Sequence, residues 1–341
     1  MLALNVKSII EETPDTRTYI IEEKDQKPIK YRAGQFLTLT INRNGAEMRR
    51  SYSLSSAPEY DDHVSFTMKQ VVNGEISRFL FRTLKEGSNL IALEPSGRFT
   101  FDAEPEVSRD IFLIAAGSGV TPVFSLLKKI LFTTTGVSVN LVLQNHNERH
   151  VIFHEQLQRI ALIYDRKLRF FNFLSNPLDP MKSSIRLNNE ILNELITDQL
   201  FFNRNKALFY ICGPLSFMRM AEFTIRQMGF ASEQIKKEIF EAPRLQSVPF
   251  SVDPAQRNIF LYKQGKYIPV KFPQSILDAA LENHIYIPFS CKAGICGTCV
   301  VKCSAGSIKM KYNDVLTDQE VADGLVLTCV GYAESDITIE I

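Results

Sequence analysis

The spacing of the cysteines constrains this chain more than any other feature. Five of the six cysteines lie between residues 291 and 329, and four of them form the pattern Cys291-x4-Cys296-x2-Cys299 followed by Cys329. In a reducing compartment, clustered thiols indicate a metal or redox centre more than disulfides. This spacing is the plant-type pattern in which four thiolates hold the two irons of a [2Fe–2S] cluster. Glycines within the loop would let backbone N–H groups approach the sulfides.

Two other metal sites compete for the same ligands. Structural zinc sites with four cysteines usually come as two C-x2-C pairs, which the x4 gap here does not provide. A four-iron cluster would recruit Cys303, because Cys296-x2-Cys299-x3-Cys303 imitates the end of the bacterial motif, but the first gap is again too long. Cys303 lies where a strand is expected to leave the loop, so a buried structural thiol is the prediction there.

The C-terminal part of the chain resembles a plant-type ferredoxin domain. The resemblance covers residues 257–341, through PFSCKAGICGTCVVKCSAGSIKM and LTDQEVADGLVLTCVGYAESDITIEI. Sequence patterns predict a hairpin at NIFLYKQGKYIPVKF, a helix at QSILDAALENH, a second hairpin after the cysteine loop and a closing strand at ITIEI. This is the outline of an α+β β-grasp fold. A modest acidic cluster, open to interpretation as a partner surface or a solvated helical turn, lies at Asp314, Asp318, Glu320 and Asp323.

Strand and helix patterns alternate from residue 111 onward. IFLIAAGSGVTPVFSLLKKIL predicts a buried strand, a glycine turn and a helix, and four further strand patterns follow at VSVNLVLQN, KLRFFNFLS, ALFYICGP and EQIKKEIF. They predict an α/β domain with a parallel sheet of about five strands, which binds ligands beyond the carboxyl ends of its strands. Two turns lie at such ends, GSGVTP from residue 117 and Cys212-Gly213-Pro214. The glycines let the backbone approach a pyrophosphate at the start of a helix.

Together the two turns resemble the nucleotide-binding half of the ferredoxin-NADP reductase family. In that family the glycine turn holds the pyrophosphate of the dinucleotide, and the second turn places its cysteine next to the nicotinamide. The corresponding positions here are Gly117, Gly119, Thr121, Cys212, Gly213 and Pro214.

The first 103 residues predict a small antiparallel β-barrel, with strand patterns such as TYIIEE, QFLTLTIN, HVSFTMKQVV and NLIALEPSGRF. Within it, RRSYSLSS resembles the R-x-Y-S strand of the same family's flavin domain, and GEIS ahead of RFLFRTL resembles its G-x-x-S turn. A guanidinium can bind phosphate, a phenol ring can stack on the isoalloxazine, and a hydroxyl can hydrogen-bond near the flavin N5. The resemblance implies FAD, with FMN as the alternative. The implied flavin-binding residues are Arg50, Tyr52, Ser53, Gly74, Ile76 and Ser77.

The end of the nucleotide domain, Lys237-Glu238-Ile239-Phe240, resembles the family's E-x-aromatic ending, where a carboxylate lies near the flavin–nicotinamide contact. An amphipathic final strand is the alternative. The resemblance implies that Ser53, Cys212 and Glu238 tune the geometry of hydride transfer, with no nucleophile required. The segment EAPRLQSVPFSVDPAQRN has three prolines and little periodicity, which predicts a linker. The expected domains are a flavin barrel (1–103), a nucleotide domain (104–241), a linker (242–256) and a ferredoxin domain (257–341).

The tip of the second strand of the nucleotide domain bears on the choice of coenzyme. The strand NLVLQN ends at Asn145 and is followed by His146, Asn147, Glu148, Arg149 and His150. An acidic residue at this tip usually binds the ribose 2′-OH of NADH, whereas cationic groups suit the 2′-phosphate of NADPH. No acidic residue stands at the tip itself and its surroundings are mildly basic, which favours NADPH over NADH.

Charge and domain order set the expected partners. A net charge of +1 gives no global field for nucleic acid. No signal peptide is recognisable and no apolar run approaches the roughly 18 residues of a membrane span, so we expect a cytoplasmic protein.

The domain order resembles the reductase components of bacterial oxygenases. It implies electron transfer from NADPH through FAD and a [2Fe–2S] cluster to an oxygenase of the phenylacetyl-CoA epoxidase type, or to another hydroxylase or a desaturase. A redox-sensing flavoprotein is the alternative from another class.

Overall fold

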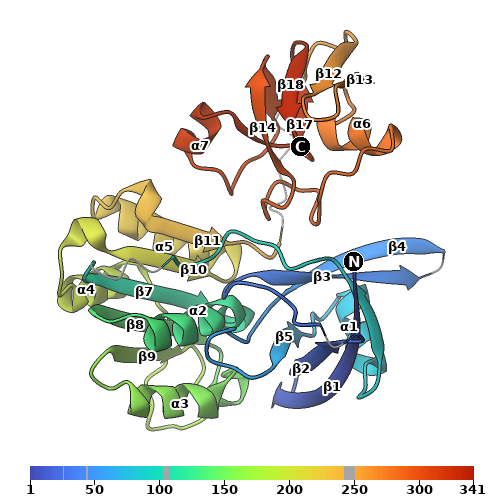
Figure 1. Ribbon diagram of the computed structural model, residues 1–341. Coiled ribbons are helices and arrows are strands. Elements are labelled where there is room, and N and C mark those ends of the chain that lie inside the picture. The colour runs from blue at the N-terminus through green and yellow to red at the C-terminus, as the bar shows by residue number, and fades with distance from the viewer. Residues whose placement is uncertain (26, 44, 103–106, 242–249) are drawn as a thin grey trace. The chain divides into compact units, whose positions relative to one another are not determined.

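The computed structural model describes the 341 residues except 26, 44, 103–106 and 242–249 (Figure 1). The contacts divide the chain into two compact units, Met1–Glu238 and Ile239–Ile341. The boundary expected between residues 103 and 104, and residues 242–249 of the expected linker, lie outside the described residues. Among the helices of the described part, none is long and apolar enough to cross a membrane.

The first unit begins with a six-stranded antiparallel sheet. Its first two strands bury roughly every second side chain, and inward side chains of the sheet pack into a core around Tyr19, Leu37 and Phe66. Helix α1 (Glu75–Thr83) buries Ile76 and Leu80 in the same core. The strands β1 (Leu2–Thr13), β2 (Thr16–Glu23), β3 (Phe36–Arg43), β4 (Ala46–Ser53), β5 (Val64–Lys69) and β6 (Asn89–Ala92) lie in the order β4-β3-β6-β1-β2-β5.

The second half of this unit is a five-stranded parallel sheet with helices between its strands. Short apolar strands, buried on both faces, form its centre, as expected for a parallel sheet covered by helices. The strand order is β11-β10-β7-β8-β9. The chain adds β8 and β9 on one side of β7 and then returns to add β10 and β11 on the other side. The elements are β7 (Arg109–Ala116), η1 (Gly117–Gly119), α2 (Val120–Thr133), β8 (Val137–Asn145), η2 (Glu148–His150), α3 (His154–Ile163), β9 (Leu168–Leu174), α4 (Asn189–Gln199), η3 (Arg204–Lys206), β10 (Leu208–Cys212), α5 (Leu215–Gln227), η4 (Ser232–Gln234) and β11 (Ile235–Glu238).

Right-handed crossovers place α2 and α3 on one face of the parallel sheet and α4 and α5 on the other. On the first face, side chains of α2 and α3 share a core with alternate residues of β7, β8 and β10, including Cys212. On the other face, the Phe112 and Phe209 rings stack with centroids 5.1 Å apart. The turns after β7 and β10 therefore open at the same carboxyl edge, where the strand order reverses.

The second unit is a small α+β domain. Helix α6 packs its buried face, including Ile276 and Leu277, against a five-stranded sheet. The sheet order is β13-β12-β18-β14-β16, and β15 pairs with β17. The elements are β12 (Arg257–Leu261), β13 (Lys266–Val270), α6 (Ile276–Glu282), β14 (Val300–Ala305), β15 (Ile308–Met310), α7 (Asp318–Ala322), β16 (Leu325–Leu327), β17 (Gly331–Ala333) and β18 (Ile337–Glu340).

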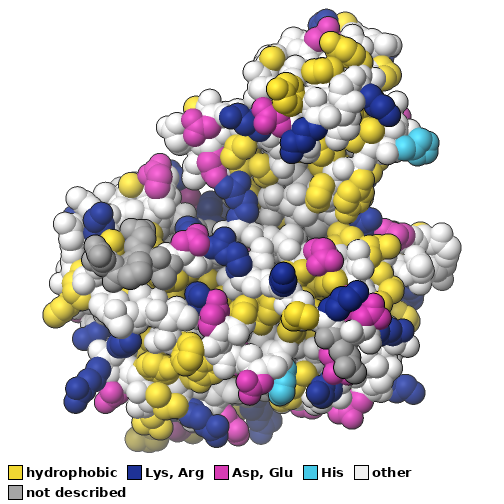
Figure 2. All heavy atoms as spheres, viewed as in Figure 1, with side chains coloured by type: hydrophobic (Ala, Val, Ile, Leu, Met, Phe, Trp, Pro, Cys, Tyr) yellow, Lys and Arg dark blue, Asp and Glu magenta, His cyan; other side chains and the backbone are white. Residues whose placement is uncertain are grey.

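The three predicted folds, an antiparallel barrel-like sheet, a parallel α/β sheet and a β-grasp domain, are all confirmed. Figure 2 shows Lys and Arg side chains interspersed with Asp and Glu over the visible face, without a field of one sign. That distribution agrees with the net charge of +1.

Candidate functional site

Strand β4 carries the three predicted flavin residues at its carboxyl end. It pairs antiparallel with β3, with Tyr52 opposite Leu37 and Ser53 opposite Phe36. Burial increases toward the carboxyl end of the strand, where Arg50 is exposed, Tyr52 half-buried and Ser53 buried. The Arg50 guanidinium donates to the Arg49 carbonyl oxygen at 2.7 Å and keeps further donors for an anion.

A column of aromatic rings supports Tyr52. Its ring lies 5.8 Å from the Phe66 ring, which stacks on Tyr19 at 5.1 Å. Burial raises the pKa of the Tyr52 hydroxyl, and the Arg50 charge opposes that shift. Tyr52 is therefore a neutral ring held in a fixed plane, which suits stacking against a flat aromatic ligand.

Helix α1 begins at the predicted G-x-x-S turn. Gly74 is its N-cap and provides no side-chain cap. A Cβ at Gly74 would lie 2.4 Å from Ser77 Oγ, so the turn is too tight for a side chain there. The Ser77 hydroxyl accepts the Val71 N–H at 3.1 Å and donates to the Gly74 carbonyl at 3.3 Å. The family resemblance implied that Ile76 and Ser77 bind the flavin; in the structure the Ser77 hydroxyl closes the turn and Ile76 joins the core.

The two nucleotide-binding turns touch each other through their backbones. A Cβ at Gly119 would lie 2.3 Å from the Cys212 carbonyl oxygen. A Cβ at Gly213 would lie 3.1 Å from the Cβ of Ala116. Gly117 has a φ of 53°, in the left-handed region that glycine adopts readily. These close approaches explain the glycines at both turns.

Helix α2 presents its first amides at this edge. It begins at Val120, directly after the 3-10 turn η1, and has no side-chain cap. Thr121 and Pro122 occupy its first turn, as the sequence predicted, and Pro214 is the N-cap of α5. The Val120 N–H donates to the Gly117 and Ser118 carbonyls, so an anion at this helix start would meet amides other than that of Val120.

Ser53, Cys212 and Glu238 meet where the antiparallel sheet adjoins this edge. Cys212 of β10 lies in register with Glu238 of β11, and the Ser53 hydroxyl lies close enough to influence the Glu238 carboxyl. Ser53 Oγ and Glu238 Oε2 are both shielded from solvent without a well-formed hydrogen bond to the described residues. Buried polar atoms are normally satisfied, so a polar ligand beside this pair would complete its hydrogen bonding.

Burial favours the neutral forms of the Glu238 carboxyl and the Cys212 thiol. Burial raises the pKa of Glu238 from 4.5 to about 8, and the Ser53 hydroxyl opposes part of that shift. Burial, reinforced by the Glu238 charge, raises the pKa of the Cys212 thiol. Cys212 is thus a neutral thiol, and Glu238 holds a proton at neutral pH.

Glu238 is expected to make the stability of the first unit fall as pH rises. Between pH 4.5 and about 8 the folded chain keeps a proton on Glu238 that the unfolded chain loses. The free energy of unfolding should then fall across this window, by at most about 1.4 kcal/mol per pH unit, with the contribution fully present at lower pH. The measurement is the temperature of flavin release between pH 5 and 8.5. Glu238→Gln should flatten the fall and the exposed Glu94→Gln should not; equal slopes in all three proteins would contradict this.

The tip of β8 carries two neighbouring histidines and a glutamate whose carboxylate already has partners within its own domain. His146 is exposed, with its ring 5.8 Å from that of His150. The Glu148 carboxylate accepts the Leu178 N–H at 2.8 Å and pairs with Lys182 at 3.2 Å. The Leu178 hydrogen bond is the main reason that the pKa of Glu148 falls to about 2. Glu148 is therefore already engaged by groups of its own domain.

The cysteine loop of the second unit brings the four predicted ligands together. Thiol–thiol interactions join Cys291 to Cys296 and Cys329, and Cys299 to Cys329. The Ala293 N–H donates to Cys291 Sγ at 3.3 Å. Such N–H donors stabilise thiolate sulfur, as an iron-bound cysteine requires.

Left-handed glycines shape this loop. Gly294 and Gly297 have φ values of 74° and 71°, and a Cβ at Gly294 would lie 2.9 Å from the Tyr312 carbonyl oxygen. Cys303 is elsewhere: its thiol donates to the Ala305 carbonyl at 3.1 Å, on strand β14.

The thiols fit a two-iron centre better than a single ion. Among the described side chains, no group of three or more His, Cys, Asp or Glu is arranged around one metal position. A zinc site needs four ligands around one ion, whereas a [2Fe–2S] cluster takes two thiolates at each iron. Cys291 interacts with both Cys296 and Cys329, and Cys299 interacts with Cys329, so the four thiols lie close to one another, as a two-iron centre requires.

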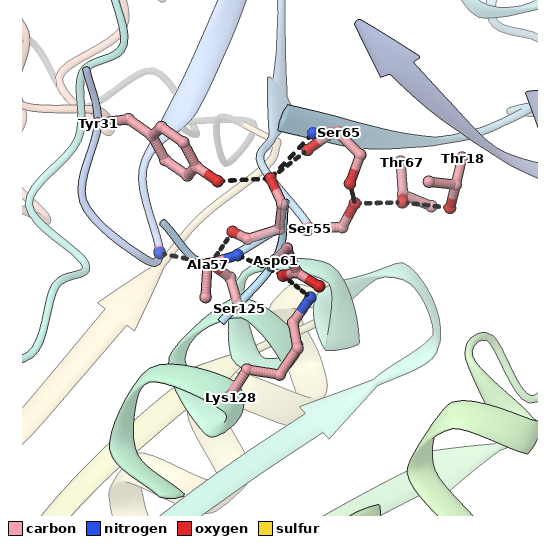
Figure 3. Close-up of polar contacts among 11 residues, drawn as sticks. Thr18, Tyr31, Ser55, Ala57, Asp61, Ser65, Thr67, Ser125 and Lys128 are labelled. Carbon is pink, nitrogen blue, oxygen red and sulfur yellow. Dashed lines mark hydrogen bonds and ion pairs between the residues drawn. The ribbon is translucent and has the colours of Figure 1, made fainter. Parts of the chain in front are cut away.

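A polar network between α2 and the antiparallel sheet was not predicted from the sequence (Figure 3). It includes Ser125 and Lys128 of α2, which contact Ser56 and Asp61 after strand β4. The sequence did carry a signal, because Thr121, Ser125 and Lys128 recur at the spacing of one helix face within an apolar pattern. A lysine on the buried face of a helix predicts a buried partner of opposite charge.

Family models match three parts of the chain. An oxidoreductase FAD-binding domain matches residues 3–101, an oxidoreductase NAD-binding domain residues 113–222, and a 2Fe-2S iron-sulfur cluster binding domain residues 259–334. The matches assign FAD to the antiparallel sheet, NAD(P)H to the parallel sheet and a [2Fe–2S] cluster to the second unit.

Curated relatives match from end to end. The chain is 32% identical to the ferredoxin reductase component of 3-ketosteroid-9-alpha-monooxygenase from Mycobacterium tuberculosis, over 98% of this chain and 94% of the relative. It is 28% identical to one of the subunits of 1,2-phenylacetyl-CoA epoxidase from Escherichia coli, over 99% of this chain and 97% of the relative.

A solved structure has the same succession of folds. Phthalate dioxygenase reductase, described as a modular structure for electron transfer from pyridine nucleotides to [2Fe-2S], superposes with a TM-score of 0.59 at 20% identity. The match covers 100% of this chain and 98% of that chain. The chain therefore belongs to the ferredoxin-NADP reductase type of oxidoreductase with a C-terminal [2Fe–2S] ferredoxin domain, the electron-transfer components of oxygenase systems.

Proposed function

We propose that this protein takes hydride from NADPH at a site bounded by Ser53, Cys212 and Glu238, and delivers single electrons to an oxygenase of the phenylacetyl-CoA epoxidase type. The observation that carries the proposal is the meeting of these side chains, with two orphaned polar atoms, between the FAD-binding and NAD-binding regions. When bound, the nicotinamide and FAD supply two-electron hydride transfer, and the [2Fe–2S] cluster supplies one-electron transfer.

The three side chains position the reacting rings and control one proton. The Ser53 hydroxyl is free to hydrogen-bond a ring nitrogen, because its own chain leaves it without a well-formed partner. The neutral Cys212 thiol is small and polarisable, and a flat ring would pack against it once the groups that bury it move aside. Glu238 can hold a proton next to Ser53 or release it as the local charge changes.

Backbone amides and Arg50 bind the phosphates in this proposal. The uncapped starts of α1 and α2 each present N–H groups to an anion, with Gly74, Ile76 and Ser77 shaping the first site. Gly117, Gly119 and Thr121 shape the second, and Gly213 and Pro214 bring the turn after β10 against it. Tyr52 provides the ring on which the flavin stacks.

The [2Fe–2S] cluster is proposed to bind Cys291, Cys296, Cys299 and Cys329. Cys299 and Cys329 are 2% and 9% exposed, whereas Cys291 and Cys296 are only half-buried. The Cys291–Cys296 side is thus the more accessible one for electron transfer to a partner.

The tip of β8 supports NADPH as the donor. Its nearest acid, Glu148, is engaged by Leu178 and Lys182, so it is not free to accept the ribose 2′-OH of NADH. The exposed His146 and the neighbouring Arg149 offer cationic or donor groups to a 2′-phosphate.

His146→Asp is expected to lower the preference for NADPH over NADH. A carboxylate there repels the 2′-phosphate and accepts the 2′-OH, so the ratio of kcat/KM values should fall about tenfold or more. Steady-state reduction of ferricyanide with each coenzyme measures this ratio. His154→Asp, the same change on α3, is the control and should leave the ratio unchanged. A parent protein that uses NADH as well as NADPH would contradict the coenzyme assignment.

Two oxygenases are candidate electron acceptors, and a direct comparison distinguishes them. The end-to-end match with the 1,2-phenylacetyl-CoA epoxidase relative supports that oxygenase type, and the higher identity to the ketosteroid monooxygenase component makes a steroid-hydroxylating oxygenase the second candidate. The test is the yield of oxygenated product per NADPH when the purified reductase is mixed with each oxygenase and its substrate. Coupled turnover is expected with the epoxidase; coupling only with the steroid oxygenase would overturn that choice.

A further inference from the structure

Ser125 ties helix α2 to the segment that follows the flavin strand (Figure 3). The Ser125 hydroxyl, fully buried, donates to the Ser56 carbonyl oxygen at 2.5 Å and accepts the Gly34 N–H at 3.3 Å. Ser56 is itself held, because its hydroxyl bonds the Tyr31 hydroxyl at 2.6 Å and accepts the Ser65 N–H at 2.9 Å. The contact therefore joins α2 to an anchored part of the FAD-binding region.

Lys128 makes a second link one turn further along α2. Its ammonium group pairs with the Asp61 carboxylate, which also accepts the Ala57 N–H at 2.7 Å. Only 5% of the Lys128 side chain is exposed, and its ammonium lies 4.4 Å from the centre of the Phe124 ring. A buried ammonium requires a paired carboxylate, so α2 cannot move away without stranding both charges.

A third contact adds to the same junction. Glu12 of β1 accepts the Thr18 hydroxyl at 2.7 Å, and it is also hydrogen-bonded by the Phe153 backbone and the Gln156 side chain. Phe153 and Gln156 belong to the start of α3. Glu12 and Lys128 also attract each other. The junction thus joins both helices on this face of the parallel sheet to the antiparallel sheet.

The two α2 contacts lie close to the proposed reacting groups along the chain. Ser56 follows Ser53 by three residues, which spans at most about 10 Å. Lys128 follows Thr121 by seven residues, about 10 Å along the helix axis. Thr121, Ser125 and Lys128 share one helix face. One rigid helix therefore carries the pyrophosphate turn at its start and the contact with the flavin-binding region along its length.

We propose that Ser125 and Lys128 are positioning residues for hydride transfer: by fastening α2 to Ser56 and Asp61, they fix how closely the nicotinamide approaches the flavin. The inference rests on the proposed function, because it assumes that the dinucleotide binds at the start of α2. A displacement of about 1 Å between reacting groups can slow a reaction about a hundredfold, so a small release of this clamp should slow hydride transfer without removing either binding site.

The test replaces the ion pair by neutral side chains of similar size. In Lys128→Met with Asp61→Asn, the asparagine can still accept the Ala57 N–H. We expect the rate of flavin reduction at saturating NADPH, in anaerobic single turnover, to fall about tenfold or more. The deuterium isotope effect with NADPH labelled at the transferred hydrogen should change, while the Kd for NADP+ changes less than about threefold. Amide hydrogen exchange should speed up in residues 54–61 and 120–133.

The matched control is Lys69→Met with Asp15→Asn. This pair, 3.4 Å apart, joins the turn between β1 and β2 to the end of β5. It should leave the limiting rate and the isotope effect within about twofold of the parent. If the Lys128 and Asp61 double variant does not fold, Ser125→Ala decides the matter, since it removes only one hydroxyl and should slow reduction several-fold.

The outcomes separate this proposal from the function on which it rests. Folded, FAD-loaded variants with parental limiting rates and isotope effects would overturn the positioning role. Unchanged exchange in residues 54–61 would overturn the clamp itself, and this readout needs no turnover. A parent protein whose flavin is not reduced by NADPH would instead contradict the proposed function, and the exchange measurement would still judge the clamp.

Discussion

Cys329→Ser is expected to remove the [2Fe–2S] absorbance while FAD stays bound. In the proposed ligand set Cys329 shares one iron with Cys299, and the loss of one thiolate leaves that iron with a single strong protein ligand. Cluster content should fall about tenfold or more, as iron and sulfide analysis and visible absorbance would measure. The flavin should remain because the FAD-binding match lies in the other compact unit.

Cys303→Ser is the matched control for this prediction. Its thiol donates to the Ala305 carbonyl on β14, and the influences on its pKa are burial and the backbones of Ala305 and Thr338. Both cofactors should be retained in this variant. A cluster that survives Cys329→Ser, or one that disappears in Cys303→Ser, would refute the ligand set.

Gly119→Ala is expected to disable the nucleotide site. The added Cβ would lie 2.3 Å from the carbonyl oxygen of Cys212, 2.5 Å from its carbon and 2.7 Å from the Gly213 nitrogen. These are backbone atoms, so the turns after β7 and β10 must move apart. We expect the rate of flavin reduction by NADPH to fall about a hundredfold and the free energy of unfolding to fall by about 1–3 kcal/mol. Stopped-flow absorbance and thermal unfolding measure the two effects.

Gly117→Asn tests whether the effect comes from the close approach and not from losing a glycine. Gly117 has a φ of 53° and open space around a Cβ, and asparagine tolerates that conformation. This variant should keep the parental stability. Parental reduction rates in Gly119→Ala would show that the two turns do not form one site.

The sequence was most informative where a residue's role depends on its near neighbours. The cysteine loop is short, so its spacing alone predicted it, whereas the family resemblance supplied the roles of the glycine turn and of the strand with Arg50. The central strands β7, β8 and β10 of the parallel sheet were also predictable, because they are largely apolar runs bounded by a turn or helix.

Pairing between distant segments could not be predicted in this way. The register that sets Cys212 opposite Glu238 joins two strands of the parallel sheet across helix α5, and no local pattern specifies it. The burial that raises the pKa of Glu238 is likewise a property of the assembled unit. The family resemblance supplied Glu238 as a candidate, and the structure supplied the reason for its unusual protonation.

Side chains that hydrogen-bond the backbone are also hard to predict, because their partners depend on the folded structure. A serine at a helix start can bind a ligand or close its own turn, and the sequence does not distinguish the two. In the structure Ser77 closes the turn between Val71 and Gly74. The sequence places Ser125 and Lys128 on one helix face, but it does not specify their distant partners, Ser56 and Asp61 in the segment between β4 and β5.

An anaerobic titration with NADPH tests the central claim most directly. FAD accepts two electrons and the cluster one, so about 1.5 equivalents of NADPH should reduce both centres of each protein molecule. In stopped flow, flavin absorbance should bleach first and the cluster absorbance should follow within seconds. A flavin that stays oxidised, or a cluster that stays oxidised beside a reduced flavin, would contradict the account of this protein as a two-electron to one-electron reductase.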